Sequence, residues 1–165
     1  VLKFLFLLYF VNFKIITIYS VLIFALCMQI FYNNYGDIMK VLSIKEPYAS
    51  LIMMNIKKIE TRSFKTKYRG ELYIHASLSK SNQNSELSKL ISPMYGEIIC
   101  KCSLVDCVLM TDEFIENLKK ENPMEYKCGH YEVGRYAWIL EDVEIIKPIK
   151  AKGKLGIWNF YENNL

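Results

Sequence analysis

Short segments in which apolar and polar residues alternate constrain the fold of this chain more than any other feature. Alternation with a period of two places apolar side chains on one face of a β-strand, and it is clearest in KKIETRS (57–63) and ELYIHAS (71–77). About five strands with few helices and turn residues between them predict an α+β fold, namely a small, mostly antiparallel β-barrel with a few short helices. The further strand-like segments are KVLSI (40–44), EIICKCSLVDCVLM (97–110), RYAWILEDVEII (135–146) and GKLGIWNF (153–160).

Short helices are expected between these strands. Pro47 suits the first turn of a helix, and an apolar patch of Ala49, Leu51, Ile52 and Met53 follows it. A second helix is predicted over TDEFIENLKKE (111–121), where Thr111 can cap the N-terminus and the lysines lie in the last turn. The polar segment SKSNQNSELSKL (79–90) predicts a surface loop that leads into a short helix.

Residues 1–38 differ in composition from the rest of the chain. The hydrophobic content of 52% is slightly above the globular norm, and the excess lies mainly in this segment. Residues 15–31 are uncharged and about long enough to span a thin bilayer, so a membrane anchor is one interpretation. We favour a misplaced translation start, because YGDIM can encode a ribosome-binding sequence just ahead of Met39. We therefore expect residues 1–38 to be an apolar leader and residues 39–165 to form one domain.

The cysteines and the net charge limit the cellular setting and the class of function. Five cysteines, an odd number without a small secreted framework, predict reduced thiols in a cytoplasmic protein. The net charge of +4 is mild, so any basic effect must come from local clustering. No C-x-x-C pair occurs, so we expect no metal site, and we expect no cofactor either. The potential metal ligands considered are Cys100, Cys102, Cys107, Cys128 and His130.

The strongest local clustering of charge is in NIKKIETRSFKTKYRG (55–70). If this segment is extended, Lys58, Glu60 and Arg62 share one face, and Lys57 at the turn before the strand can reach the same face. Paired hydrogen bonds between Arg62 and Glu60 would leave an ammonium free to meet a phosphate or a carbonyl. An exposed strand edge with weak salt bridges fits the spacing equally well. The six basic residues are Lys57, Lys58, Arg62, Lys65, Lys67 and Arg69.

Three motifs occur in one order along the chain: LSIKEPYASLI (42–52), NIKKIETRSFKTKYRGELYIHAS (55–77) and GRYAWILEDVEIIKPIKAKGKLGIWNF (134–160). Together they resemble the ASCH domain, the activating-signal-cointegrator homology family, and in particular its small bacterial members. The resemblance covers essentially Met39 to Phe160 and implies a PUA-like barrel beside which a cleft binds RNA or a nucleoside-sized ligand.

The residues that carry the resemblance depart from the family pattern at two positions. The family motif is a glycine, any residue, lysine, two residues, glutamate, one residue and arginine. Lys57, Glu60 and Arg62 match it, and Asn55 replaces the glycine, which is a mild change because Asn also tolerates a left-handed backbone. Glu46 stands where this subgroup often has glutamine before the proline.

The first function that the resemblance implies is binding of RNA or a nucleotide in a cationic cleft with a central glutamate. Tyr48 and Trp138 lie in the motifs and can stack on bases, as aromatic residues do in single-strand binders. Trp158 is instead expected in the core, and His75 is interpreted as a hydrogen-bonded core histidine. The residues expected to bind the ligand are Lys57, Glu60, Arg62, Tyr48, Lys65, Lys67, Arg69 and Trp138.

The second function that the resemblance implies is hydrolysis of a modified nucleoside or of RNA. Some relatives remove the acetyl group of N4-acetylcytidine, and there the motif lysine activates a threonine at the position of Glu60. Thr61 is adjacent but is expected to face the other side of the strand. Catalysis would then rest on Glu60 as a general base, with Lys57 or Arg62 stabilising the oxyanion. The missing threonine favours binding, whereas a nucleoside-sized cleft favours hydrolysis, so both interpretations stay open.

Overall fold

The computed structural model describes residues 18–29, 38–80 and 85–161. The chain divides into two units, Met39–Phe160 and the two terminal segments together. In the terminal unit, residues 18–29 form a helix with exposed side chains. Over the described ranges, no helix is both long enough and apolar enough to cross a membrane. The ends of the predicted span 15–31 lie outside the described residues, and the assignment of residues 1–38 as a leader stays a prediction.

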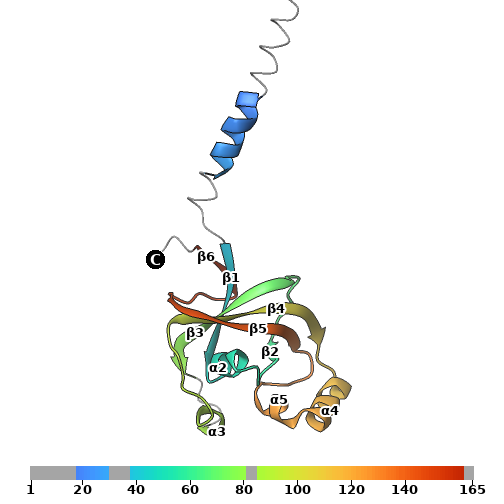
Figure 1. Ribbon diagram of the computed structural model, residues 1–165. Coiled ribbons are helices and arrows are strands. Elements are labelled where there is room, and N and C mark those ends of the chain that lie inside the picture. The colour runs from blue at the N-terminus through green and yellow to red at the C-terminus, as the bar shows by residue number, and fades with distance from the viewer. Residues whose placement is uncertain (1–17, 30–37, 81–84, 162–165) are drawn as a thin grey trace, which may run out of the picture. The chain divides into compact units, whose positions relative to one another are not determined.

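The larger unit is built on one six-stranded sheet with the order β2-β5-β4-β3-β1-β6 (Figure 1). β1 pairs with β3 in parallel, whereas β2 with β5, β3 with β4 and β4 with β5 are antiparallel, so the sheet is mixed. The strands are β1 (Ile38–Glu46), β2 (Ile59–Arg62), β3 (Gly70–Lys80), β4 (Glu97–Leu109), β5 (Tyr136–Lys150) and β6 (Ile157–Tyr161).

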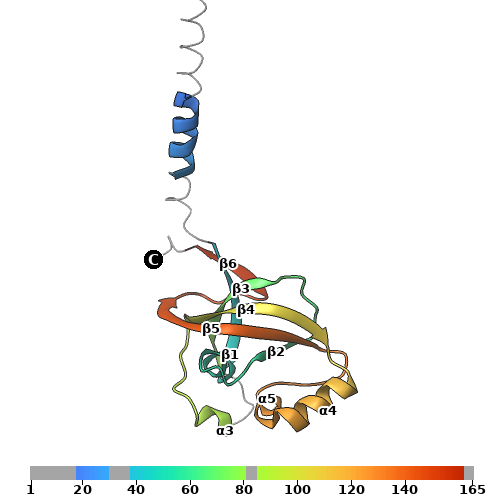
Figure 2. The same cartoon turned by 45° about the vertical axis from the view of Figure 1, so that its right-hand side comes forward.

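Four short helices accompany the sheet, which confirms the predicted α+β class. α2 packs against β3, β4 and β5, while α3, α4 and α5 lie at the end of the unit away from β6 (Figures 1 and 2). The Thr111 hydroxyl caps α4 by accepting a hydrogen bond from the Phe114 N–H at 3.1 Å, as predicted. The helices are α2 (Tyr48–Met53), α3 (Ser85–Ser88), α4 (Asp112–Glu121) and α5 (Pro123–Lys127).

The local sequence signals match most elements but not their ends. β4 is a long strand as predicted, and its pairing with β5 contains register shifts. β2 is shorter than the predicted strand 57–63 and covers only Ile59–Arg62. The chain before it turns at Asn55, whose φ of 57° lies in the left-handed region. α5 was not predicted, since five residues are too few for a helical period to show.

The main core lies between α2 and the central strands. Its largest member is Trp138 on β5, whose side chain is fully buried. Cys100 and Cys102 on β4 share this core, and burial raises the pKa of each thiol to about 12. Trp158 and Phe160 on β6 form a second core with residues of β1 and β4, as the sequence predicted for Trp158.

The predicted closed barrel is not formed among the described strands, because β2 and β6 remain as edges of the sheet. Three strands separate β2 from β1 in the sheet order, yet the Arg62 Nη2 on β2 donates a hydrogen bond to the Ser43 carbonyl on β1 at 3.2 Å. The sheet therefore curls until β2 approaches β1. A side chain bridges the two strands where a barrel would have a backbone ladder.

Candidate ligand-binding site

A pocket of about 950 Å³ lies where β2 approaches β1. This volume is near the upper end of the roughly 300–1,000 Å³ that small-molecule sites occupy. β1, α2, β2 and β3 contribute to its lining, as do the segments 128–130 and 152–156. The charged residues that line it are Lys45, Lys57, Arg62, Arg135, Lys152, Lys154 and one carboxylate residue, Glu60.

Lys57, Glu60 and Arg62 form a charged group in this pocket, here called the motif cluster. The Lys57 Nζ lies 3.7 Å from the Glu60 Oε2, and the Arg62 Nε lies 3.1 Å from the Glu60 Oε1. The side chain of Lys57 is only 1% exposed and that of Glu60 is 12% exposed. Lys57 Nζ also donates a hydrogen bond to the Ile59 carbonyl. The exposed-edge interpretation therefore does not hold for the motif cluster, which is largely buried.

Arg62 differs from its expected arrangement. The predicted pair of hydrogen bonds to Glu60 is not formed, because the Nε–Oε1 contact does not have hydrogen-bond geometry and Nη2 donates to Ser43 instead. The guanidinium carbon lies 5.9 Å from the centroid of the Trp138 ring. Lys58, expected on the same face as Glu60, is exposed and does not line the pocket.

The two aromatic residues expected at the ligand lie in different environments. Tyr48 lines the pocket, with its ring centroid 5.6 Å from the Lys57 Nζ. Trp138 is fully buried, and its Nε1 donates a hydrogen bond to the Phe64 carbonyl at 3.3 Å. Trp138 thus supports Arg62 from within the core and presents no open face to a base in this structure.

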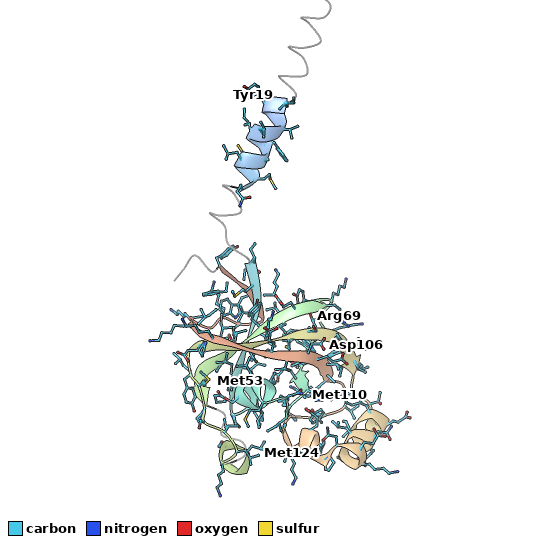
Figure 3. All side chains as sticks on the ribbon, viewed as in Figure 1. Tyr19, Met53, Arg69, Asp106, Met110 and Met124 are labelled. Atoms are coloured by element: carbon cyan, nitrogen blue, oxygen red, sulfur yellow. The ribbon has the colours of Figure 1, made fainter. Side chains whose placement is uncertain are left out.

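The basic loop 63–69 lies outside the pocket. Its three predicted ligand contacts, Lys65, Lys67 and Arg69, are exposed and do not contribute to the lining. Arg69 pairs with Asp106 on β4 at 2.9 Å, and the two side chains lie next to each other in Figure 3. The pKa of Asp106 is lowered, mainly by the hydrogen bond from the Cys107 N–H and next by the one from Arg69.

Unsatisfied polar atoms are concentrated at this pocket. Among the described residues, three buried side-chain nitrogens lack a hydrogen-bond partner: Arg62 Nε, His75 Nδ1 and Arg135 Nε. All three residues line the pocket. Because nearly all buried polar groups in folded proteins have partners, these atoms mark a place where a polar ligand can supply the missing hydrogen bonds.

His75 on β3 is hydrogen-bonded, as predicted, but it also lines the pocket. Its Nε2 lies 3.0 Å from the Ala151 carbonyl, which can only accept, so Nε2 carries the proton and Nδ1 is a bare acceptor. Burial lowers the pKa of His75, which favours the neutral ring.

A model of the ASCH domain family matches residues 42–151. The chain belongs to the ASCH domain family. ASCH domains are PUA-like and are associated with RNA binding. The match includes the motif cluster, Tyr48 and His75, and it ends just before the 152–156 segment of the pocket. No curated protein matches this chain.

Glu125 on α5 positions the motif cluster of this ASCH domain, although the sequence did not point to it. Its carboxylate is buried and accepts hydrogen bonds from the Lys58 N–H at 2.6 Å and the Ile59 N–H at 3.2 Å. The Tyr131 hydroxyl donates a third hydrogen bond, at 2.8 Å. Burial is the main reason why the pKa of Tyr131 is raised, and the Glu125 carboxylate is the second. Glu125 therefore holds the backbone from which Lys57 and Glu60 project.

Four pocket cations of the ASCH domain were also missed: Lys45, Arg135, Lys152 and Lys154. The run KAKGK (150–154) was a visible signal for two of them, but it stood far in the sequence from the motif. Glu46 stands at the position where relatives often have glutamine. It accepts hydrogen bonds from the Ser50 N–H and hydroxyl, so it stabilises α2, and it does not line the pocket. The described part of the chain contains no group of His, Cys, Asp or Glu side chains arranged to hold a metal.

Proposed function

We propose that this ASCH domain binds RNA or a nucleotide in the pocket between β1 and β2. The observation that carries this proposal is the charge of the lining, in which six lysines and arginines face one carboxylate. A concave site lined by one sign of charge raises the local concentration of ligands of the opposite sign. Ligands that carry phosphate meet this requirement.

The motif cluster supplies the groups that would recognise a base. Glu60 contacts Lys57 and Arg62 only as ion pairs, and no described residue donates a hydrogen bond to its carboxylate. Its oxygens can therefore accept from an amino group of a base, as carboxylates accept from the amino group of cytosine. Tyr48 offers an aromatic ring beside Lys57 for stacking.

The remaining residues that were expected to contact the ligand lie outside the pocket and would not contact the base. The exposed loop with Lys65, Lys67 and Arg69 would meet phosphates of a longer RNA strand outside the pocket. In this proposal the space between β2 and β1 is the opening of a PUA-like barrel, and Arg62 spans it.

The direct test is titration of a fluorescently labelled RNA pentamer with the full-length protein. We expect Lys57→Ala and Arg62→Ala to weaken binding while both variants stay folded by circular dichroism. Affinity should fall as salt rises, because phosphate contacts release counterions. Glu60→Gln should change affinity only modestly, since the amide keeps the shape of the carboxylate. Unchanged affinity in the folded Lys57 and Arg62 variants would show that the pocket is not the binding site.

A second candidate function is hydrolysis of a modified nucleoside such as N4-acetylcytidine, and the contact between Lys57 and Glu60 favours it. Glu60 would take a proton from water, the resulting hydroxide would attack the acetyl carbon, and Lys57 would stabilise the oxyanion. The C–N bond then breaks, the amine receives the proton and acetate leaves. Thr61 lines the pocket, but its hydroxyl accepts a hydrogen bond from the His130 N–H at 3.3 Å.

Turnover of N4-acetylcytidine distinguishes the two functions. We expect the wild-type protein to release no acetate above background, and Glu60→Thr, which restores the residue of the hydrolytic relatives, to release at most a trace. Wild-type turnover that falls by ~100-fold or more in Glu60→Gln would instead establish Glu60 as a catalytic base.

A further inference from the structure

The pocket has a second charged part, which we call the lysine end. It consists of Lys45 on β1 and of Lys152 and Lys154 in the segment between β5 and β6. All three lysines are exposed, and within the described ranges none of them forms an ion pair with a carboxylate. The lysine end therefore holds positive charge that no described group of the protein neutralises.

Ser43 joins the lysine end to the motif cluster. Its carbonyl accepts the hydrogen bond from Arg62, and its hydroxyl accepts one from the Trp158 Nε1 at 3.2 Å. The Lys154 Nζ in turn lies 5.5 Å from the centroid of the Trp158 ring. Ser43 and Trp158 thus connect Arg62 to Lys154, and because both charged parts line the same pocket, a single ligand can contact both.

The backbone at Gly153 packs closely against His75 and Ser43, two residues that line the pocket. A Cβ added there would lie 2.6 Å from the His75 Cε1 and 3.0 Å from the Ser43 Oγ. Only glycine allows this close approach, and its two neighbours in the chain, Lys152 and Lys154, both line the pocket. Because burial lowers the pKa of His75, the positive charge at this end comes from the lysines.

The two parts of the pocket differ in the charge of the ligand group that they accept. The motif cluster contains the Glu60 carboxylate, which repels a phosphate and accepts hydrogen bonds from a base. The lysine end has no carboxylate in the lining. Ammonium groups bind phosphate through charge-assisted hydrogen bonds.

We propose that the lysine end is a phosphate subsite, so that the ligand is a phosphorylated nucleotide and not a free nucleoside. The inference rests on the proposed function, because the base of the same ligand lies at the motif cluster. A nucleoside monophosphate and a phosphodiester of an RNA strand carry the same chemistry, and either can supply the phosphate.

The test compares three probes on the full-length protein by calorimetric titration at one salt concentration: cytidine, cytidine 5′-monophosphate and the RNA pentamer of cytidine. The double variant Lys152→Ala/Lys154→Ala removes two charges from the pocket. The control Lys147→Ala/Lys150→Ala removes two exposed charges of β5 that do not line it. Circular dichroism establishes that each variant is folded.

We expect the wild-type protein to bind at least one phosphorylated probe about tenfold or more tighter than cytidine. In the pocket variant, Lys152→Ala/Lys154→Ala, this preference should decrease to about threefold while the affinity for cytidine is unchanged. The control variant should keep the wild-type preference. The slope of log affinity against log salt concentration should decrease in the pocket variant by an amount that corresponds to about one to two phosphate contacts. Tight binding of the monophosphate identifies a nucleotide as the source of the phosphate, and preference for the pentamer alone identifies an RNA strand.

Equal wild-type affinity for cytidine and both phosphorylated probes would overturn the phosphate subsite. An equal loss of preference in the control variant would overturn it as well. In both cases the proposed function would stand if Arg62→Ala still weakened binding. Failure of all three probes to bind would refute the proposed function together with the subsite.

Discussion

The motif cluster and the basic loop 63–69 come from one stretch of sequence but lie in different environments. Lys57 and Arg62 are largely buried around Glu60 in the pocket, whereas Arg69 pairs with Asp106 on the surface. The motif cluster lies on and just before β2, and the loop follows this strand. Breaking the buried pairs should therefore cost more stability than breaking the exposed pair, because water can replace a lost partner only at the surface.

The largest expected difference between the two regions is in stability. Glu60→Ala removes the carboxylate next to Lys57, whose side chain is 1% exposed, and leaves a buried cation without its counter-ion. Breaking a buried pair in this way costs about 3 kcal/mol or more. Urea denaturation monitored by circular dichroism should show a much lower midpoint than for wild type. Asp106→Ala, which breaks an exposed pair, is the matched control and should shift the midpoint far less. Similar midpoints in the two variants would contradict the distinction.

The next difference is in ligand binding. Arg62→Ala should weaken binding of the RNA pentamer by ~1.5–3 kcal/mol if the guanidinium makes a charged hydrogen bond to the ligand. This corresponds to roughly tenfold to one hundredfold in Kd, measured by fluorescence anisotropy. Arg69→Ala removes the same type of side chain from the loop and should stay within about twofold, since the pentamer is shorter than the strands that would reach the loop and Arg69 is exposed. A larger loss in the Arg69 variant would move the binding site to the loop.

A smaller effect tests how β2 is held in place. Glu125→Gln replaces one acceptor oxygen by an amide donor that faces the N–H groups of Lys58 and Ile59. We expect a loss of about 1–2 kcal/mol in the free energy of unfolding, because a buried donor is left without an acceptor. Glu132→Gln, at an exposed carboxylate, is the control. Equal stability of the two variants would mean that Glu125 does not anchor the strand.

The smallest effect concerns pH and His75. Burial lowers the folded-state pKa of His75 below its unfolded value of about 6.5, so the unfolded state binds the proton first as pH falls. The stability from the neutral ring is present above pH 6.5 and is lost as pH falls toward the folded-state pKa. Between pH 7.5 and 5.5, His75→Gln should show a flatter decrease in Tm than wild type. The contribution of His75 to the free energy of unfolding can change by at most about 1.4 kcal/mol per pH unit. Parallel curves for the two proteins would exclude this role.

Local sequence signals predicted the elements that local physics determines. Alternating apolar residues located the strands, because a strand exposes every second side chain to the core. Thr111 located the start of α4, because its hydroxyl satisfies an N–H of the first turn. Asn55 was recognised as a residue that tolerates the left-handed backbone, which it adopts at φ 57°. The resemblance located Lys57, Glu60 and Arg62 as a group, and they are close together in the structure.

Only the tertiary structure decided which other residues meet this group. Glu125 reaches β2 from a helix more than sixty positions away, and Lys45, Lys152 and Lys154 join the pocket because the sheet curls until β2 approaches β1. Alternation tells which face of a strand is apolar, but not which strands lie opposite each other in the curled sheet. For the same reason Trp138 could be located on a strand in the sequence, while its burial behind Arg62 depends on how β2 and β5 pair.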